Sequence, residues 1–119
     1  MHTATKNRRW PILAAATLAS AAMLASTEAR SLDAEGAESL ARQNKCFRCH
    51  SVDKKKVGPP FKEVSAKYKG NKDAASKLTT HVTGGGKMKT DGGKVEDHPA
   101  VKSKKPEEVK NLVDWNLTL

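Results

Sequence analysis

Apolar residues recur at helical spacing in the segment that precedes the two cysteines of the chain. Ala37, Leu40 and Ala41 lie three and four positions apart, so they share one face of a helix. Asp33 precedes them and can cap the first turn through its carboxylate. The pattern predicts an α-helix over residues 34–45 with a narrow apolar face.

The same period occurs in three more segments. We expect short helices at residues 61–68 and 73–82, and a final helix that begins at Pro106, where proline fits the first helical turn. Gly70 and the glycines at 84–86 end the two short helices. The expected apolar stripes consist of Phe61, Val64, Ser65 and Tyr68, then Ala74, Leu78 and Val82, and finally Val109, Leu112, Val113 and Leu117, with Trp115 beside the last stripe.

Two segments between these helices show neither a helical nor an alternating pattern. Residues 51–60 contain three consecutive lysines followed by Gly-Pro-Pro, and residues 84–105 are rich in Gly and Lys. A loop of about 20 residues is long for a small domain, and such loops are usually functional. Because the chain shows no strand pattern, the expected fold class is all-α, with short helices around a group that the sequence does not encode.

Composition narrows the classes of protein further. The chain has 119 residues and only 4% aromatic residues, so its core is thin and needs a cofactor, metal or staple. This length excludes a two-domain enzyme, and two cysteines exclude four-cysteine zinc sites and disulfide-rich scaffolds. The formal net charge of +9 favours an acidic partner, either a protein patch, a nucleic acid or an anionic membrane.

The N-terminus has the organisation of a secretory signal peptide. Three basic residues precede an uncharged, alanine-rich run over residues 10–24, which is too short to span a bilayer comfortably. Small residues then allow a cut after Ala29. We therefore expect a signal peptide at 1–29 and a mature domain at 30–119, with an uncleaved membrane anchor as the alternative. Cleavage leaves a formal charge of +7 and, in a Gram-negative bacterium, a periplasmic protein without stable membrane insertion.

The motif that carries chemistry is Cys-Phe-Arg-Cys-His at residues 46–50. Two thiols at this spacing can reach the two vinyl groups on one edge of a haem, and His50 then lies under the iron as a ligand. Two alternatives use the same residues. Cys46 and Cys49 could form a thioredoxin-like redox pair, although that motif requires a βαβ context. They could also form a plain disulfide, which would close a very short loop.

At this point the chain resembles the small class I cytochromes c of bacteria, from about residue 34 to the C-terminus. Four stretches carry the resemblance: Cys-Phe-Arg-Cys-His-Ser-Val-Asp at 46–53, Val-Gly-Pro-Pro-Phe at 57–61, Ala-Lys-Tyr-Lys-Gly at 66–70 and Asn-Leu-Val-Asp-Trp at 111–115. The resemblance implies one covalent haem c, with the N- and C-terminal helices crossing beside it. It also implies that Pro59 packs near His50 and that a backbone carbonyl holds the second nitrogen of that ring. We include Phe61 and Tyr68 among the residues expected to bind the haem.

The sequence leaves more than one candidate for the second axial ligand, because the family's usual Met-Pro box is missing. His98-Pro99 lies within about two positions of the place where that box is expected, and imidazole is a good iron ligand. Met88, about ten residues earlier, is the alternative, and an iron without a second protein ligand is another. His81 falls in the predicted third helix, where we expect an exposed side chain. Ligation by His98 predicts a lower potential than ligation by a thioether.

The predicted function is electron transfer rather than catalysis. No constellation of acid, base and nucleophile is present, whereas lysines follow the haem motif and flank the distal loop, where they can steer an acidic redox partner. We expect the protein to be a monomer. We do not expect it to bind nucleic acid, because the chain lacks aromatic stacking platforms. Two alternatives remain open: the electron-accepting subunit of a periplasmic dehydrogenase, and a haem protein that binds or senses gases.

Overall fold

The structure, a computed structural model, describes residues 31–119 and contains four α-helices. They are α1 (Ala34–Gln43), α2 (Phe61–Tyr68), α3 (Ala74–Thr80) and α4 (Pro106–Leu117). The all-α prediction is confirmed, and each helix lies where a helix was expected. The predicted signal peptide lies outside the described residues. Each described helix is too short to cross a bilayer.

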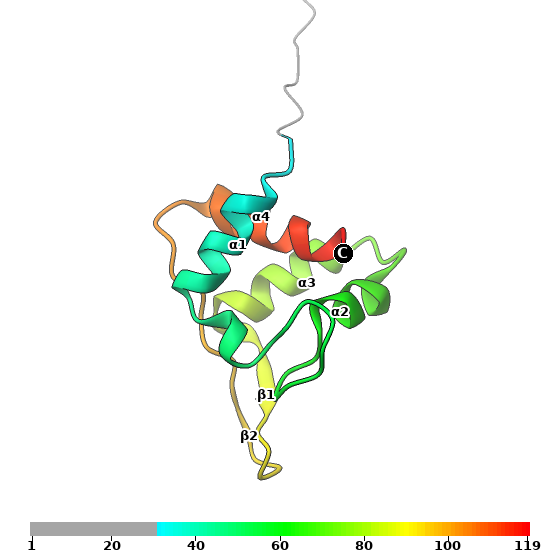
Figure 1. Ribbon diagram of the computed structural model, residues 1–119, viewed down its shortest axis with the longest axis vertical. Helices are drawn as coiled ribbons and strands as arrows, with labels where there is room; N and C mark the ends of the chain where they lie inside the picture. Colours follow the sequence, from blue (N-terminus) through cyan, green and yellow to red (C-terminus); the bar gives the residue numbers. More distant parts are fainter. Residues whose placement is uncertain (1–30) are drawn as a thin grey trace, which may run out of the picture.

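The first and last helices cross and form the core of the domain (Figure 1). Ala37 and Ala41 are fully buried at the crossing, and their small side chains let the two backbones approach closely. Leu40 of α1 packs there with Leu112 and Trp115 of α4. The sequence predicts Trp115 at the edge of the apolar stripe. The side chain is only 4% exposed, so it lies at the centre of the core instead. Leu117 is half-buried instead.

Paired hydrogen bonds fix the relative position of the two crossing helices. The side chain of Asn111 in α4 accepts from the backbone N–H of Asp33 at 2.9 Å and donates to the carbonyl of the same residue at 2.6 Å. Asp33 also caps α1, because its carboxylate accepts from the N–H of Gly36 at 2.8 Å. The N-terminus of α1 is therefore tied to the middle of α4.

Helix α1 ends earlier than predicted because the chain turns sharply before the cysteines. Asn44 is its C-cap, and Lys45 adopts a left-handed conformation with φ of 59°. A short 3-10 turn, η1 (Cys46–Arg48), follows. The turn directs the cysteine motif beneath α1.

Helix α3 leads into the largest departure from the sequence-based expectation. It widens into a π-helical turn, η2 (His81–Gly85), in which Gly84 has φ of 110°. Two antiparallel strands follow, β1 (Lys87–Lys89) and β2 (Val95–Asp97), and they project from the end of the molecule opposite the helix crossing (Figure 1). The prediction of a loop over residues 84–105 is therefore wrong for the residues of these two strands. The strands are short and almost wholly exposed, so no hydrophobic alternation marks them.

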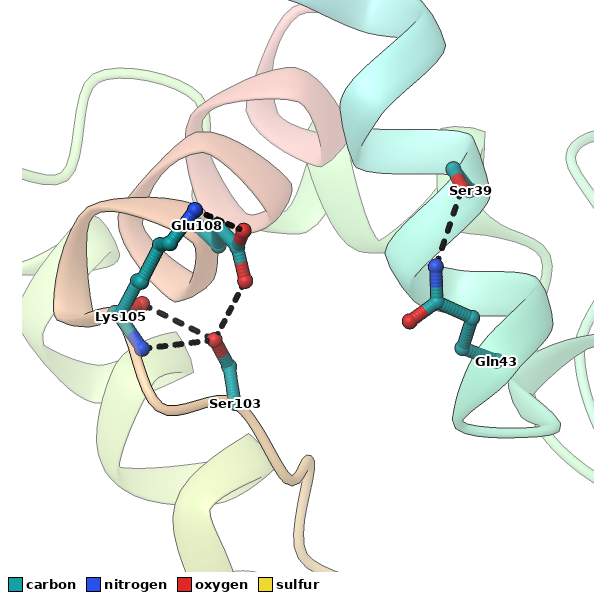
Figure 2. A network of polar contacts seen from close by, with 5 residues as sticks. All are labelled: Ser39, Gln43, Ser103, Lys105 and Glu108. Atoms are coloured by element: carbon teal, nitrogen blue, oxygen red, sulfur yellow. Dashed lines mark hydrogen bonds and ion pairs between the residues drawn. The ribbon is translucent and has the colours of Figure 1, made fainter.

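The start of α4 is stabilised by a small polar network (Figure 2). The Ser103 hydroxyl donates to the Glu108 carboxylate at 2.6 Å and accepts from the backbone N–H of Lys105 at 3.0 Å. The Lys105 ammonium lies 3.6 Å from the other oxygen of Glu108. This network fixes the direction in which the chain enters α4.

Candidate functional site

A cavity of about 470 Å³ lies between the helices, within the size range of cofactor sites. One wall carries both cysteines and His50, and the opposite wall is built by η2, β1 and the segment after β2. All the sequence-predicted site residues line this cavity: Cys46, Cys49, His50, Pro59, Phe61, Tyr68, Met88 and His98.

The cysteine motif is wound into one tight turn. The carbonyl of Cys46 accepts hydrogen bonds from the N–H groups of Cys49 at 3.1 Å and His50 at 2.9 Å. Both cysteines are free thiols, and burial raises the pKa of the Cys46 thiol, which therefore stays protonated at neutral pH. The described residues contain no βαβ unit, since their one sheet is a two-stranded antiparallel hairpin. This context does not favour the redox-pair and disulfide alternatives.

The segment at 57–61 forms a cradle for the imidazole of His50. Its Nδ1 lies 2.8 Å from the carbonyl oxygen of Pro59. Because a carbonyl can only accept, Nδ1 carries the proton, and Nε2 is the ring nitrogen left available to a metal. Gly58 lies so close to the ring that an added Cβ would be 2.5 Å from Cε1. Phe61 stacks on the ring, with centroids 5.1 Å apart and an interplanar angle of 21°.

His98 is held in a comparable way on the opposite wall. Its N–H donates to the carbonyl of Gly86 at 2.9 Å, and its Nδ1 lies 2.9 Å from the carbonyl oxygen of Pro99. The second contact again places the proton on Nδ1 and leaves Nε2 free. Burial lowers the pKa of His98 below its ordinary value, so its ring is neutral near pH 7. The centroids of the His50 and His98 rings are 6.1 Å apart.

His81 also lines the cavity, which corrects the expectation that its side chain is exposed. It is half-buried, and its ring centroid is 4.4 Å from that of His98. Burial lowers its pKa as well. An added Cβ at Gly86 would collide with its ring, so glycine is needed at that position to make room. The signal was present in the sequence, because His81 follows Leu78 by three positions and so shares its buried helical face.

Met88 lies in the middle of β1, directly opposite Glu96 of β2. Its side chain is the only half-buried one in that strand, and it reaches the same cavity. Phe61 and Tyr68, both half-buried, reach the cavity from the two ends of α2. Phe61 also contacts Trp115 edge-on, with centroids 5.7 Å apart, and so connects the cavity to the core.

Known proteins that resemble this chain belong to one family. Residues 34–119 match the family model described as cytochrome c. The chain is 40% identical over 82 residues to cytochrome c-551 of Pseudomonas denitrificans, covering 69% of this chain and 95% of that protein. It is 39% identical over 80 residues to cytochrome c-552 of Nitrosomonas europaea, covering 67% and 75%. The solved structure of the class 1 cytochrome MtoD from Sideroxydans lithotrophicus ES-1 is similar, with 50% identity and a TM-score of 0.69 over 74% of this chain and 97% of that one.

The chain belongs to the cytochrome c family. It is a small class I monohaem cytochrome c, and the resemblance found in the sequence is confirmed. Membership implies a covalently bound haem c and electron transfer rather than enzymatic catalysis. Cys46 and Cys49 are the only cysteines of the cytochrome, so they are available for the two thioether bonds.

The spacing of the His50 and His98 imidazoles fits a haem iron between them. A metal ion bound by two imidazoles separates the ring centres by roughly 6 Å, since each bond is about 2 Å long and each nitrogen is about 1 Å from its ring centre. The distance of 6.1 Å between His50 and His98 meets this requirement. Both rings also have Nδ1 bound to a backbone carbonyl, which is the usual support of a metal-bound histidine.

Proposed function

We propose that this cytochrome is a periplasmic one-electron carrier of low potential, with His50 and His98 as the axial ligands of its haem. The observation that carries the proposal is the separation of the two imidazole ring centroids in the cavity, 6.1 Å, with Nδ1 of each ring at a backbone carbonyl. Met88 lines the same cavity but is held in the β1–β2 register.

The choice of ligand sets the chemistry of the carrier. When bound, the haem supplies a one-electron couple whose potential depends on the axial ligands. A thioether favours the reduced state, whereas an imidazole donates more strongly to the oxidised state, so a second histidine lowers the potential. The carbonyls of Pro59 and Pro99 accept from the two Nδ1–H groups and thereby strengthen both imidazoles as donors.

The fold supports transfer of an electron without large rearrangement. His50 is confined between Gly58 and Phe61, and His98 is bound through its backbone to Gly86. Leu112 and Trp115 line the cavity and belong to the core at the helix crossing. Ligands held in this way keep their positions in both oxidation states.

The partners we propose are acidic redox proteins. Exposed lysines lie in the segments after the cysteine motif and around the hairpin and the distal loop, and they carry the positive charge that would attract such a partner. They comprise Lys54, Lys55, Lys56, Lys62, Lys67, Lys69, Lys72, Lys87, Lys89, Lys102, Lys104 and Lys105. Lys67, Lys87 and Lys89 among them line the cavity. We further propose that residues 1–29 are a signal peptide and that residues 30–119 act as a periplasmic monomer.

Two variants of the matured holoprotein test the ligand assignment. His98→Ala should convert the ferric spectrum from low-spin to high-spin, and the reduced protein should then bind carbon monoxide. Met88→Leu is the matched control, because it changes a residue of the same cavity, and it should leave the spectrum and the potential unchanged. The opposite pattern, with the spectral change in Met88→Leu alone, would overturn the assignment.

A further inference from the structure

The segment that carries His98 depends on other parts of the molecule for its position. Residues 98–105, here called the distal strap, contain no helix or strand of their own. The backbone groups of such a segment must find partners elsewhere in the protein or in water. Its anchors therefore decide how firmly His98 faces His50.

Three anchors hold the distal strap on its own side of the cavity. The N–H of His98 donates to Gly86, and the N–H of Val101 donates to the carbonyl of Val82 at 2.7 Å. At its far end, Ser103 bonds to Glu108 at the start of α4 (Figure 2). Val101 also packs against the core that α1 and α4 form, but none of these contacts is a hydrogen-bonded connection to the wall that carries the cysteines.

Asn44 supplies that connection. Its Oδ1 accepts from the backbone N–H of Lys102 at 2.7 Å, and its Nδ2 lies 3.3 Å from the carbonyl oxygen of the same residue. The Nδ2 group also donates to the carbonyl of Leu40 at 3.0 Å, within α1. Among the described residues, no other hydrogen bond joins the distal strap to the wall that carries the cysteines.

The position of Asn44 gives this contact its significance. It is the C-cap of α1, it lines the haem cavity, and it precedes Cys46 by two residues. An amide side chain offers both a donor and an acceptor, so it can satisfy both polar groups of the Lys102 backbone. A carboxylate could accept from the N–H but could not donate to either carbonyl.

We propose that Asn44 is a positioning residue that clamps the distal strap to the haem-attachment side and so keeps His98 opposite His50. This inference rests on the proposed ligation by His98. An external ligand binds the iron only when His98 is released. Loosening the clamp should therefore increase the rate at which such a ligand binds, while the resting spectrum is retained.

The test compares two neighbouring substitutions in the matured holoprotein, Asn44→Ala and Gln43→Ala. Gln43 is a matched control, because it is exposed and its side chain bonds only to Ser39 within α1 (Figure 2). We expect cyanide to bind ferric Asn44→Ala about tenfold faster than the wild type, a change of about 1.4 kcal/mol in the opening of the strap. Gln43→Ala should bind cyanide at the wild-type rate.

Equal rates in the two variants would overturn the proposal. If Asn44→Ala fails to mature, Asn44→Asp takes its place, because it keeps the acceptor for the Lys102 N–H. Its rate of cyanide binding should rise by a smaller but measurable amount. An unchanged rate in Asn44→Asp would also overturn the proposal. The near-infrared spectrum of the wild type separates the two possible failures. A sulfur-to-iron band would refute ligation by His98 itself, whereas a bis-imidazole spectrum without any effect of Asn44 would refute only the clamp.

Discussion

Replacing Gly58 with alanine should disturb His50, the proposed proximal ligand, without touching the cysteines. The added Cβ would lie 2.5 Å from Cε1, 2.8 Å from Nδ1 and 3.0 Å from Nε2 of His50. Ordinary contact begins at about 3.4 Å, so the ring must retreat by close to 1 Å. Phe61 stacks on the ring and restricts the retreat, and the bond from Nδ1 to the Pro59 carbonyl is the contact that yields.

The loss of that bond has a calculable effect on the potential. A hydrogen bond of this type contributes about 1 kcal/mol net, and it strengthens the imidazole as a donor to ferric iron. For a one-electron couple, tenfold in equilibrium corresponds to about 59 mV, so about 1 kcal/mol corresponds to roughly 40 mV. Only the difference in this bond between the two oxidation states changes the potential, so Gly58→Ala should raise the potential by up to roughly 40 mV.

Spectroelectrochemical titration of the matured protein measures this shift directly. Gly92→Ala is the control, since Gly92 lies between the two strands and an added Cβ there would meet only the Thr90 hydroxyl at 3.9 Å. We expect Gly92→Ala to titrate as the wild type. An unchanged or lower potential in Gly58→Ala would refute the argument that Gly58 and Pro59 together hold the proximal ring.

Three further outcomes are expected. Cys46→Ala should leave the haem attached by one thioether bond through Cys49, and a pyridine haemochrome spectrum with both bonds intact would contradict the attachment. Trp115→Ala should lower the free energy of unfolding by about 3–5 kcal/mol, because it empties the centre of the core, and an unchanged denaturation midpoint would contradict that. Acidification below the ordinary histidine pKa of 6.5 should destabilise the protein, because burial lowers the pKa of His81 and the unfolded chain then binds more protons. Urea midpoints between about pH 7.5 and about pH 5.5 measure this, and a rise in stability on acidification would contradict it.

The helices and the attachment site could be predicted because short-range signals determine them. The apolar period and Pro106 indicate α4, and the Gly-Pro-Pro run indicates where α2 begins. The spacing of Cys46, Cys49 and His50 is local, so the sequence alone indicates the chemistry that we propose for them.

Features that depend on long-range contacts could not be predicted in the same way. The β1–β2 hairpin carries polar residues on both faces, so its strands leave no pattern to detect. Trp115 was placed at the edge of a stripe, but the crossing of α1 over α4 buries it. Asn44 gave no signal at all, because its partner Lys102 is 58 residues away.

The near-infrared spectrum of the oxidised, matured protein tests the central claim most directly. With His50 and His98 as ligands, the ferric protein should be low-spin and should lack the weak sulfur-to-iron charge-transfer band. The presence of that band would make Met88 the ligand and would contradict both the assignment of His98 and the low potential that follows from it.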